Sequence, residues 1–265
     1  MRVNDRRESV FRQLGPVEVP GSHVLRSLED NEAARGAAVA LGLAPNPVQI
    51  KTWDNVLALR VIAALNPERD APIVDLGCRS GILLTWLDQI GYRRLYGCDL
   101  RQPAPPLRAA LKARLWQTVA AGTAAYLRHR QRLVKASVED TGFPAGGFAV
   151  AASMSVIEHG VDLSRFFAEA ARLLRPGGTL IVSTDYWPTR IDVGELRRFQ
   201  VSRGSDRIFD REDVVRLCDI ARSVGLVGPA SLDLEAGHPV VSSSGFSYTF
   251  LLLLFRREDR LKGPA

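Results

Sequence analysis

Residues that could do chemistry follow two apolar runs in the first half of the chain. The first run carries Asp75 and leads into Gly77 and, four residues later, Gly81. The second run ends at Asp99. Glycines after one strand let the backbone approach a nucleotide, and a carboxylate at the end of the next strand accepts hydrogen bonds from a ribose diol. The spacing therefore predicts a nucleotide site at the carboxyl ends of two neighbouring parallel strands.

The glycine spacing also distinguishes between nucleotides. A dinucleotide site needs G-x-G-x-x-G, but Arg79 stands at the middle glycine position and no P-loop lysine follows. The pattern Asp75-x-Gly77-x-x-x-Gly81 resembles motif I of the class I S-adenosylmethionine-dependent methyltransferases. A nicotinamide-dependent oxidoreductase is therefore the weakest interpretation.

Three later segments resemble the same family, in the same order. Residues 138–150 are similar to the segment that holds the adenine, and residues 153–159 to the end of the fourth strand. Residues 173–182 contain Pro-Gly-Gly, the family's turn before the fifth strand. Together the motifs cover residues 70–185, and the resemblance implies a methyltransferase whose cofactor is S-adenosylmethionine.

The resemblance also implies which residues hold the cofactor. Asp99 would accept the ribose hydroxyls, Asp75 would face the donor's ammonium, and Ser137 and Val138 would meet the adenine edge. The expected cofactor-binding residues are Asp75, Gly77, Cys78, Gly81, Asp99, Leu100, Ser137, Val138, Ser153 and Met154. The sequence departs from the family at Arg79 and Ser137, where a glycine and an acid are usual. A non-glycine at the first position must either avoid a positive φ or bear a cost of about 1 kcal/mol or more. At the second position a weaker adenine contact is expected.

The pair Glu158-His159 follows the fourth strand, where donor and acceptor would meet. Histidine titrates near neutral pH, so His159 is the candidate base that removes a hydroxyl proton during methyl transfer. The alternative is a structural pair that holds the following helix. Some quinone O-methyltransferases bind a divalent metal through an acid at the position of Ser155, so no metal is expected here.

Aromatic side chains mark the acceptor side. Trp53, Asp185, Tyr186 and Trp187 flank predicted strand ends and are the expected substrate-binding residues. Aromatic rings there would stack on a sugar or another ring system. The alternative is that they pack loops.

Composition limits the classes of protein. The chain has 265 residues and a net charge of +6, and its longest apolar run, residues 250–255, is too short to span a bilayer. The N-terminus lacks the apolar core of a signal peptide, and the three cysteines have no metal-binding spacing, so a cytoplasmic location is expected. Residues 101–138 contain six arginines, two lysines and no acid. Confinement of the excess charge to one segment argues against a nucleic acid partner, and a homodimer is left open.

The coarse pattern predicts an α/β fold. The family resemblance implies a Rossmann-like, seven-stranded, mostly parallel, doubly wound sheet with an antiparallel strand seven, in the order 3-2-1-4-5-7-6. The predicted strands are 72–76, 95–99, 132–137, 148–153, 179–184, 231–234 and 246–255. The predicted helices are 27–41, 53–65, 82–90, 105–130 and 211–224. We divide the chain into an N-terminal helical extension or lid (1–50), a methyltransferase core (51–258) and a tail (259–265). Within the core, 101–131 is a helical insertion and 185–208 an acceptor-side loop.

The favoured function is S-adenosylmethionine-dependent methyl transfer to a small-molecule acceptor, at a hydroxyl of a sugar, glycan intermediate or secondary metabolite. Two alternatives remain: a macromolecular methyltransferase acting on RNA or protein, and a catalytically silent homologue that binds the donor.

Overall fold

The computed structural model describes residues 19–66, 69–79, 81–101, 131–194 and 206–258. The predicted helix 105–130, nearly all of the insertion 101–131 and the tail 259–265 lie outside these residues. Part of the predicted acceptor-side loop, residues 195–205, lies outside them as well. In the described part, no helix is long and apolar enough to cross a bilayer.

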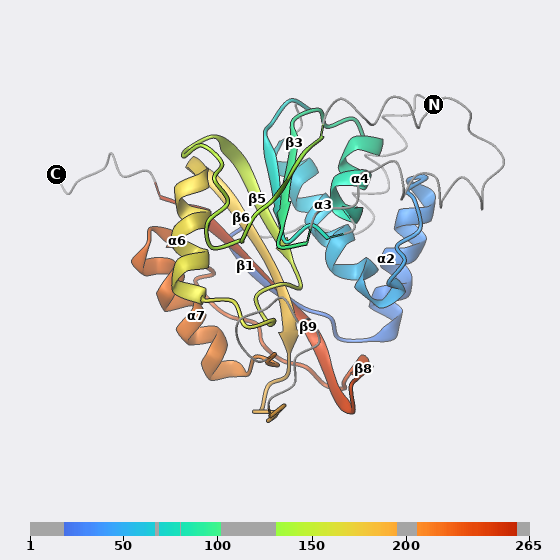
Figure 1. Ribbon diagram of the computed structural model, residues 1–265. Coiled ribbons are helices and arrows are strands. Elements are labelled where there is room, and N and C mark those ends of the chain that lie inside the picture. Colours follow the sequence, from blue (N-terminus) through green and yellow to red (C-terminus); the bar gives the residue numbers. More distant parts are fainter. Residues whose placement is uncertain (1–18, 67–68, 80, 102–130, 195–205, 259–265) are drawn as a thin grey trace.

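A nine-stranded sheet forms the centre of the molecule (Figure 1). Its strands are β1 (Gly21–Val24), β2 (Ile73–Leu76), β3 (Leu95–Asp99), β4 (Gln131–Lys135), β5 (Phe148–Met154), β6 (Leu174–Tyr186), β7 (Leu226–Val227), β8 (Val241–Ser243) and β9 (Phe246–Arg257). The main order is β1-β9-β6-β5-β2-β3-β4. The five strands from β2 to β6 pair in parallel, and β9 runs antiparallel beside β6. The predicted Rossmann-like α/β fold with an antiparallel strand is therefore confirmed.

Helices cover both faces of the sheet (Figure 1). One face carries α2 (Leu28–Ala40), the short 3-10 helix η1 (Gln49–Lys51), α3 (Thr52–Leu65) and α4 (Ile82–Gln89). The other face carries α6 (Leu163–Leu173) and α7 (Arg211–Ser223). Successive residues of a strand point to opposite faces, so Ile73 packs in the core on the α2–α4 side and Val74 in the core on the α6–α7 side. Both are fully buried, as expected of a parallel sheet between two helical layers.

The outer edge of β9 differs from the prediction. The predicted strand 231–234 is wrong, because these residues form no strand. The N-terminal β1 instead pairs with β9 from Leu251 to Leu254, and β7 pairs only with Arg256 and Arg257. A strand has a single outer edge, so β1 leaves room for just two residues of β7. The N-terminal extension thus supplies a strand of the sheet as well as a helix.

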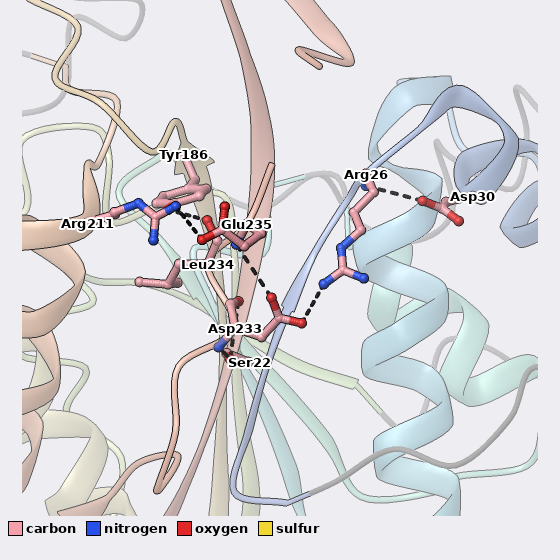
Figure 2. A network of polar contacts seen from close by, with 8 residues as sticks. All are labelled: Ser22, Arg26, Asp30, Tyr186, Arg211, Asp233, Leu234 and Glu235. Atoms are coloured by element: carbon pink, nitrogen blue, oxygen red, sulfur yellow. Dashed lines mark hydrogen bonds and ion pairs between the residues drawn. The ribbon is translucent and has the colours of Figure 1, made fainter. Parts of the chain in front are cut away.

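Side-chain contacts hold the segment that was predicted as a strand (Figure 2). The Asp233 carboxylate forms an ion pair with Arg26, and the backbone N–H of Asp233 donates to the Ser22 hydroxyl at 2.8 Å. The Tyr186 hydroxyl donates to the Leu234 carbonyl at 2.8 Å. The segment is therefore fastened to β1 and β6 by polar side chains rather than by a backbone ladder.

Strand β6 begins at Leu174, five residues before the predicted start at Thr179. It includes Pro-Gly-Gly, and Gly177 has a φ of +70°. The register with β5 shifts opposite this segment, between Phe148 and Val150. The predicted turn is thus an irregularity inside a longer strand.

Gly97 in β3 provides a test of core packing. A Cβ there would lie 2.9 Å from Cys78 Sγ and 2.9 Å from Leu133 Cδ2. We expect Gly97→Ala to lower the free energy of unfolding by about 1–3 kcal/mol because the core has no space for the methyl group. Gly36→Ala in α2 is the control: no atom lies within 4 Å of its Cβ position, and it should raise stability by up to about 1 kcal/mol. Urea unfolding measures both, and equal effects of the two substitutions would contradict this packing.

Candidate functional site

A cavity of about 580 Å³ lies at the carboxyl edge of the parallel strands. Because β9 is antiparallel, its first residues lie at this same edge, and Tyr248 and Phe250 line the cavity with Asp99 of β3. Three strands (β2, β5 and β6) separate β3 from β9. At the usual strand spacing, the cavity therefore extends about 19 Å across the sheet. Its volume falls in the range of sites that bind small molecules and cofactors.

Most of the predicted cofactor residues meet in this cavity. The predicted residues that line it are Asp75, Gly77, Cys78, Asp99, Leu100, Ser137, Val138, Met154 and His159. Two of the predicted cofactor-binding residues, Gly81 and Ser153, do not line it. Gly81 caps α4 in the left-handed conformation at φ +64°, and Ser153 is buried and donates its hydroxyl to the Leu76 carbonyl. These two shape the strand ends from behind the cavity wall.

The glycine turn after β2 is bonded to the end of β3. The N–H groups of Gly77 and Cys78 both donate to the Cys98 carbonyl, at 2.8 and 3.0 Å. Gly77 has a φ of +83°, and a Cβ on it would lie 2.5 Å from Val156 Cγ2. Only glycine satisfies both the backbone angle and the close approach at this position.

Arg79 takes a left-handed backbone at φ +36°, so of the two outcomes left open for this residue the strained one is present. Its N–H donates to Asp99 Oδ2 at 2.9 Å, and the Arg101 N–H donates to Oδ1 at 2.9 Å. The two bonds fix the Asp99 carboxylate at the cavity, where each oxygen has a second lone pair for a ligand hydroxyl.

Asp75 is the most perturbed acid of the cavity lining. It is 3% exposed, and its Oδ1 is buried with no hydrogen-bond partner among the described residues. Burial, and secondarily the charge of Asp99, raise the pKa of Asp75 to about 7. A buried acid without a partner is costly unless a ligand supplies a donor or a positive charge. The ammonium of S-adenosylmethionine fits this requirement.

His159 stands beside two carboxylates. Its Nδ1 lies 3.1 Å from Asp206 Oδ1, and its Nε2 lies 3.9 Å from Glu158 Oε1. Both carboxylates are fully buried. Asp206 is 47 residues away along the chain, and the sequence contained no local pattern that could have paired it with His159.

The floor beneath the cavity contains a buried acid of α3. Asp54 accepts the Ser183 hydroxyl at 2.8 Å, and the Ser183 oxygen accepts the Ser155 N–H at 3.0 Å. Burial raises the pKa of Asp54, and the nearby Lys51 charge partly opposes this. Ser155, at φ +54°, lines the cavity. In the described ranges, no three His, Cys, Asp or Glu side chains gather as a metal site.

Comparisons with known proteins agree with this geometry. Residues 74–182 match the family described as "Methyltransferase domain". A "probable S-adenosylmethionine-dependent methyltransferase" of Mycobacterium tuberculosis is 30% identical over 115 residues, which are 41% of each chain. Residues 74–182 therefore form a methyltransferase domain of the kind that the sequence motifs resemble. S-adenosylmethionine is the cofactor, as predicted.

The names of other similar proteins state a pathway or a substrate. A ubiquinone biosynthesis O-methyltransferase of Methylobacterium nodulans is 32% identical over 125 residues, 45% of each chain. The chain thus spans less than half the length of these curated relatives. Among solved structures, the Burkholderia thailandensis 1,6-didemethyltoxoflavin-N1-methyltransferase has a TM-score of 0.52 and 20% identity, covering 92% of this chain and 94% of that one. A geranyl diphosphate methyltransferase has a TM-score of 0.54 and 18% identity, covering 86% and 90%. At these identities the likeness shows the fold.

The predicted substrate-binding residues do not line the cavity. Asp185 and Tyr186 are fully buried, and burial raises the pKa of the Tyr186 phenol to about 12. Trp53 and Trp187 pack against a cluster that contains Tyr248. Trp53 lies in α3 and Trp187 directly follows β6, and both support the cavity wall from behind. The sequence missed the residues that do line this side, which come from distant segments: Ile50, Lys51, Val241, Ser242, Tyr248 and Phe250.

The raised pKa of Asp75 predicts a pH-dependent stability. The unfolded chain releases the Asp75 proton near pH 3.8, whereas the folded chain holds it to about pH 7. The contribution of Asp75 to the free energy of unfolding is therefore fully present below pH 3.8 and is lost as pH rises to about 7. In urea unfolding without ligand, the free energy of unfolding of wild type should fall relative to that of Asp75→Asn over this pH window. Above the window the two curves of stability against pH should run parallel. The exposed Asp70→Asn is the control and should follow wild type; a parallel Asp75→Asn curve at every pH would refute the assignment.

Proposed function

We propose that this protein transfers a methyl group from S-adenosylmethionine to a hydroxyl of a small molecule, in the class of sugars, glycan intermediates or secondary metabolites. The observation that carries the proposal is that one cavity holds both a fixed Asp99 carboxylate and the buried Asp75, whose Oδ1 has no hydrogen-bond partner among the described residues. The first suits a ribose diol and the second an ammonium group, and S-adenosylmethionine carries both.

The donor supplies a methyl carbon on a positively charged sulfur that leaves without acid assistance. The residues therefore have three tasks: to hold the donor, to align the acceptor oxygen and to take its proton. Alignment of two reactants can supply about 7–11 kcal/mol of barrier reduction in well-oriented reactions. Asp75, Asp99 and the glycine turn at Gly77 have the first task, and the walls around Tyr248 have the second.

His159 has the third task in this proposal. With Nδ1–H directed at Asp206, the neutral ring presents Nε2 as the proton-accepting atom. As the acceptor oxygen bonds to the methyl carbon, its proton passes to Nε2. The resulting imidazolium lies between the carboxylates of Asp206 and Glu158, which stabilise its charge.

A small-molecule acceptor is supported by the cavity and by two of the similar proteins. The volume of about 580 Å³ suits a donor with a small acceptor. By their names, the Methylobacterium relative acts in ubiquinone biosynthesis and the Burkholderia enzyme methylates 1,6-didemethyltoxoflavin. The competing proposal is an RNA or protein acceptor.

Donor binding tests the proposal first. In calorimetry, wild type should bind S-adenosylhomocysteine and not NAD, because the cavity offers Asp75 to an ammonium. Asp99→Ala should weaken S-adenosylhomocysteine at least about 100-fold, since two hydrogen bonds to a charged group are lost. Asp70→Ala, an exposed acid outside the cavity lining, should bind as wild type. Binding of NAD in preference to S-adenosylhomocysteine would overturn the proposal.

The acceptor class can be tested with methyl-labelled S-adenosylmethionine and fractionated cell extract. Label should enter the low-mass fraction with wild type and not with Asp99→Ala. Label found only in acid-precipitable RNA or protein would support the macromolecular alternative instead. Donor binding with no label in any fraction would support a catalytically silent homologue.

If His159 is the base, its loss should slow turnover and leave donor binding nearly unchanged. His159→Ala should slow label transfer about 100-fold, the usual contribution of a general base. S-adenosylhomocysteine affinity and the thermal midpoint should change little, because the lost group acts on the acceptor proton. The exposed His238→Ala should be neutral in all three assays. A large fall in the thermal midpoint with an unchanged rate would assign His159 to a structural role.

A further inference from the structure

The β9 side of the cavity differs in chemistry from the donor side. It is lined by the apolar side chains of Ile50, Val241 and Phe250, by Tyr248, and by Lys51. Phe250 is fully buried and Tyr248 is 3% exposed, so both are fixed by the core behind them. The Lys51 Nζ lies 4.7 Å from the centre of the Phe250 ring. A cation thus stands against a rigid aromatic wall inside the cavity.

The charged residues of the lining also differ between the two sides. The acids Asp75, Asp99 and Glu139 lie on or beside the ends of β2, β3 and β4, where Arg79 and Arg101 line the cavity as well. On the β9 side, Lys51 is the charged residue, and it forms no ion pair with a carboxylate of the described residues. The nearby Asp54 carboxylate offsets part of the free-energy cost of placing the Lys51 charge there. The Asp54 oxygens, however, already accept hydrogen bonds from Ser183 and Asn55.

We propose that the β9 side is the acceptor subsite and that it selects a ring compound carrying a single carboxylate, which Lys51 binds. The proposal rests on the methyl transfer proposed above and narrows its acceptor class. Ile50 and Val241 offer apolar surface to a ring, whereas a neutral sugar would leave Lys51 without an anion and set hydroxyls against apolar walls. One lysine is a point charge for one anionic group; a diphosphate would need more cations than this wall holds.

The position of His159 fits such an acceptor. It follows β5, and β6 alone lies between β5 and β9. Two strand spacings, about 10 Å, therefore separate the ends of these strands. A single ring with a hydroxyl at one end and a carboxylate at the other, together with its hydrogen bonds, spans such a distance. The hydroxyl would then reach the His159 side of the cavity while the carboxylate meets Lys51.

The test compares three probes on protein saturated with S-adenosylhomocysteine at neutral pH. They are 4-hydroxybenzoate, its uncharged analogue 4-hydroxybenzamide, and methyl glucoside, each titrated by ligand-observed NMR or calorimetry. We expect wild type to bind 4-hydroxybenzoate about tenfold more tightly than the amide, the size of one hydrogen bond to a charged group. Methyl glucoside should bind more weakly than either.

Variants assign the preference to Lys51. Lys51→Met should reduce the tenfold preference to less than about twofold, Lys51→Arg should keep most of it, and S-adenosylhomocysteine affinity should be unchanged in both. Lys135→Met removes an exposed lysine outside the cavity lining and should match wild type. If Lys51→Met does not fold, the ratio of the affinities for 4-hydroxybenzoate and 4-hydroxybenzamide, measured in wild type and in Lys51→Arg, still tests the proposal.

Two results separate this inference from the function on which it rests. Equal binding of acid and amide, tighter binding of methyl glucoside, or an unchanged preference in Lys51→Met would overturn the acceptor class and leave methyl transfer standing. Failure of wild type to bind S-adenosylhomocysteine would instead overturn the proposed function.

Discussion

The bonds between the glycine turn and the end of β3 set the geometry of the whole site. Four backbone N–H groups point at two neighbouring residues of that strand: Gly77 and Cys78 donate to the Cys98 carbonyl, and Arg79 and Arg101 donate to the Asp99 carboxylate. Such groups are costly to leave unpaired when they are buried. The turn therefore cannot shift without breaking several bonds at once. The position of the Asp99 carboxylate follows from the parallel pairing of β2 with β3.

The carboxyl edge of the sheet also holds features that folding alone would disfavour. Asp75 is buried beside Asp99, and its pKa is raised because ionisation there is opposed by both burial and like charge. Three non-glycine residues of the described chain have a positive φ: Arg79, Ser155 and Ser244. Arg79 and Ser155 line the cavity. Ser244 directly follows Ser243, a lining residue at the end of β8. Strain and perturbed acids gather at one place when a ligand, rather than the fold, determines the residues.

The antiparallel direction of β9 explains how one cavity combines two chemistries. A parallel strand in that place would bring its carboxyl end to this edge, whereas β9 brings Tyr248 and Phe250 from its amino end. Strand β1 closes the other edge of β9 and connects, through α2, to the Lys51 segment. The N-terminal extension therefore contributes both to the sheet and to the cavity wall. The donor side comes from the family's motifs, and the opposite side comes from segments far apart in the sequence.

The sequence by itself determined the elements whose signals are local. Strand β3 was predicted with its observed bounds, and Ser27 caps α2 through the bond to the Asp30 N–H that its residue type favours. The meeting of Asp75, Gly77 and Asp99 in one cavity was predictable because these residues have a fixed spacing around one turn. Only the tertiary structure decided that Asp206 meets His159, that β1 takes the edge assigned to residues 231–234, and that Tyr186 turns into the core. These outcomes depend on competition between distant segments for one strand edge or one buried volume, and no local pattern of residues records which segment wins.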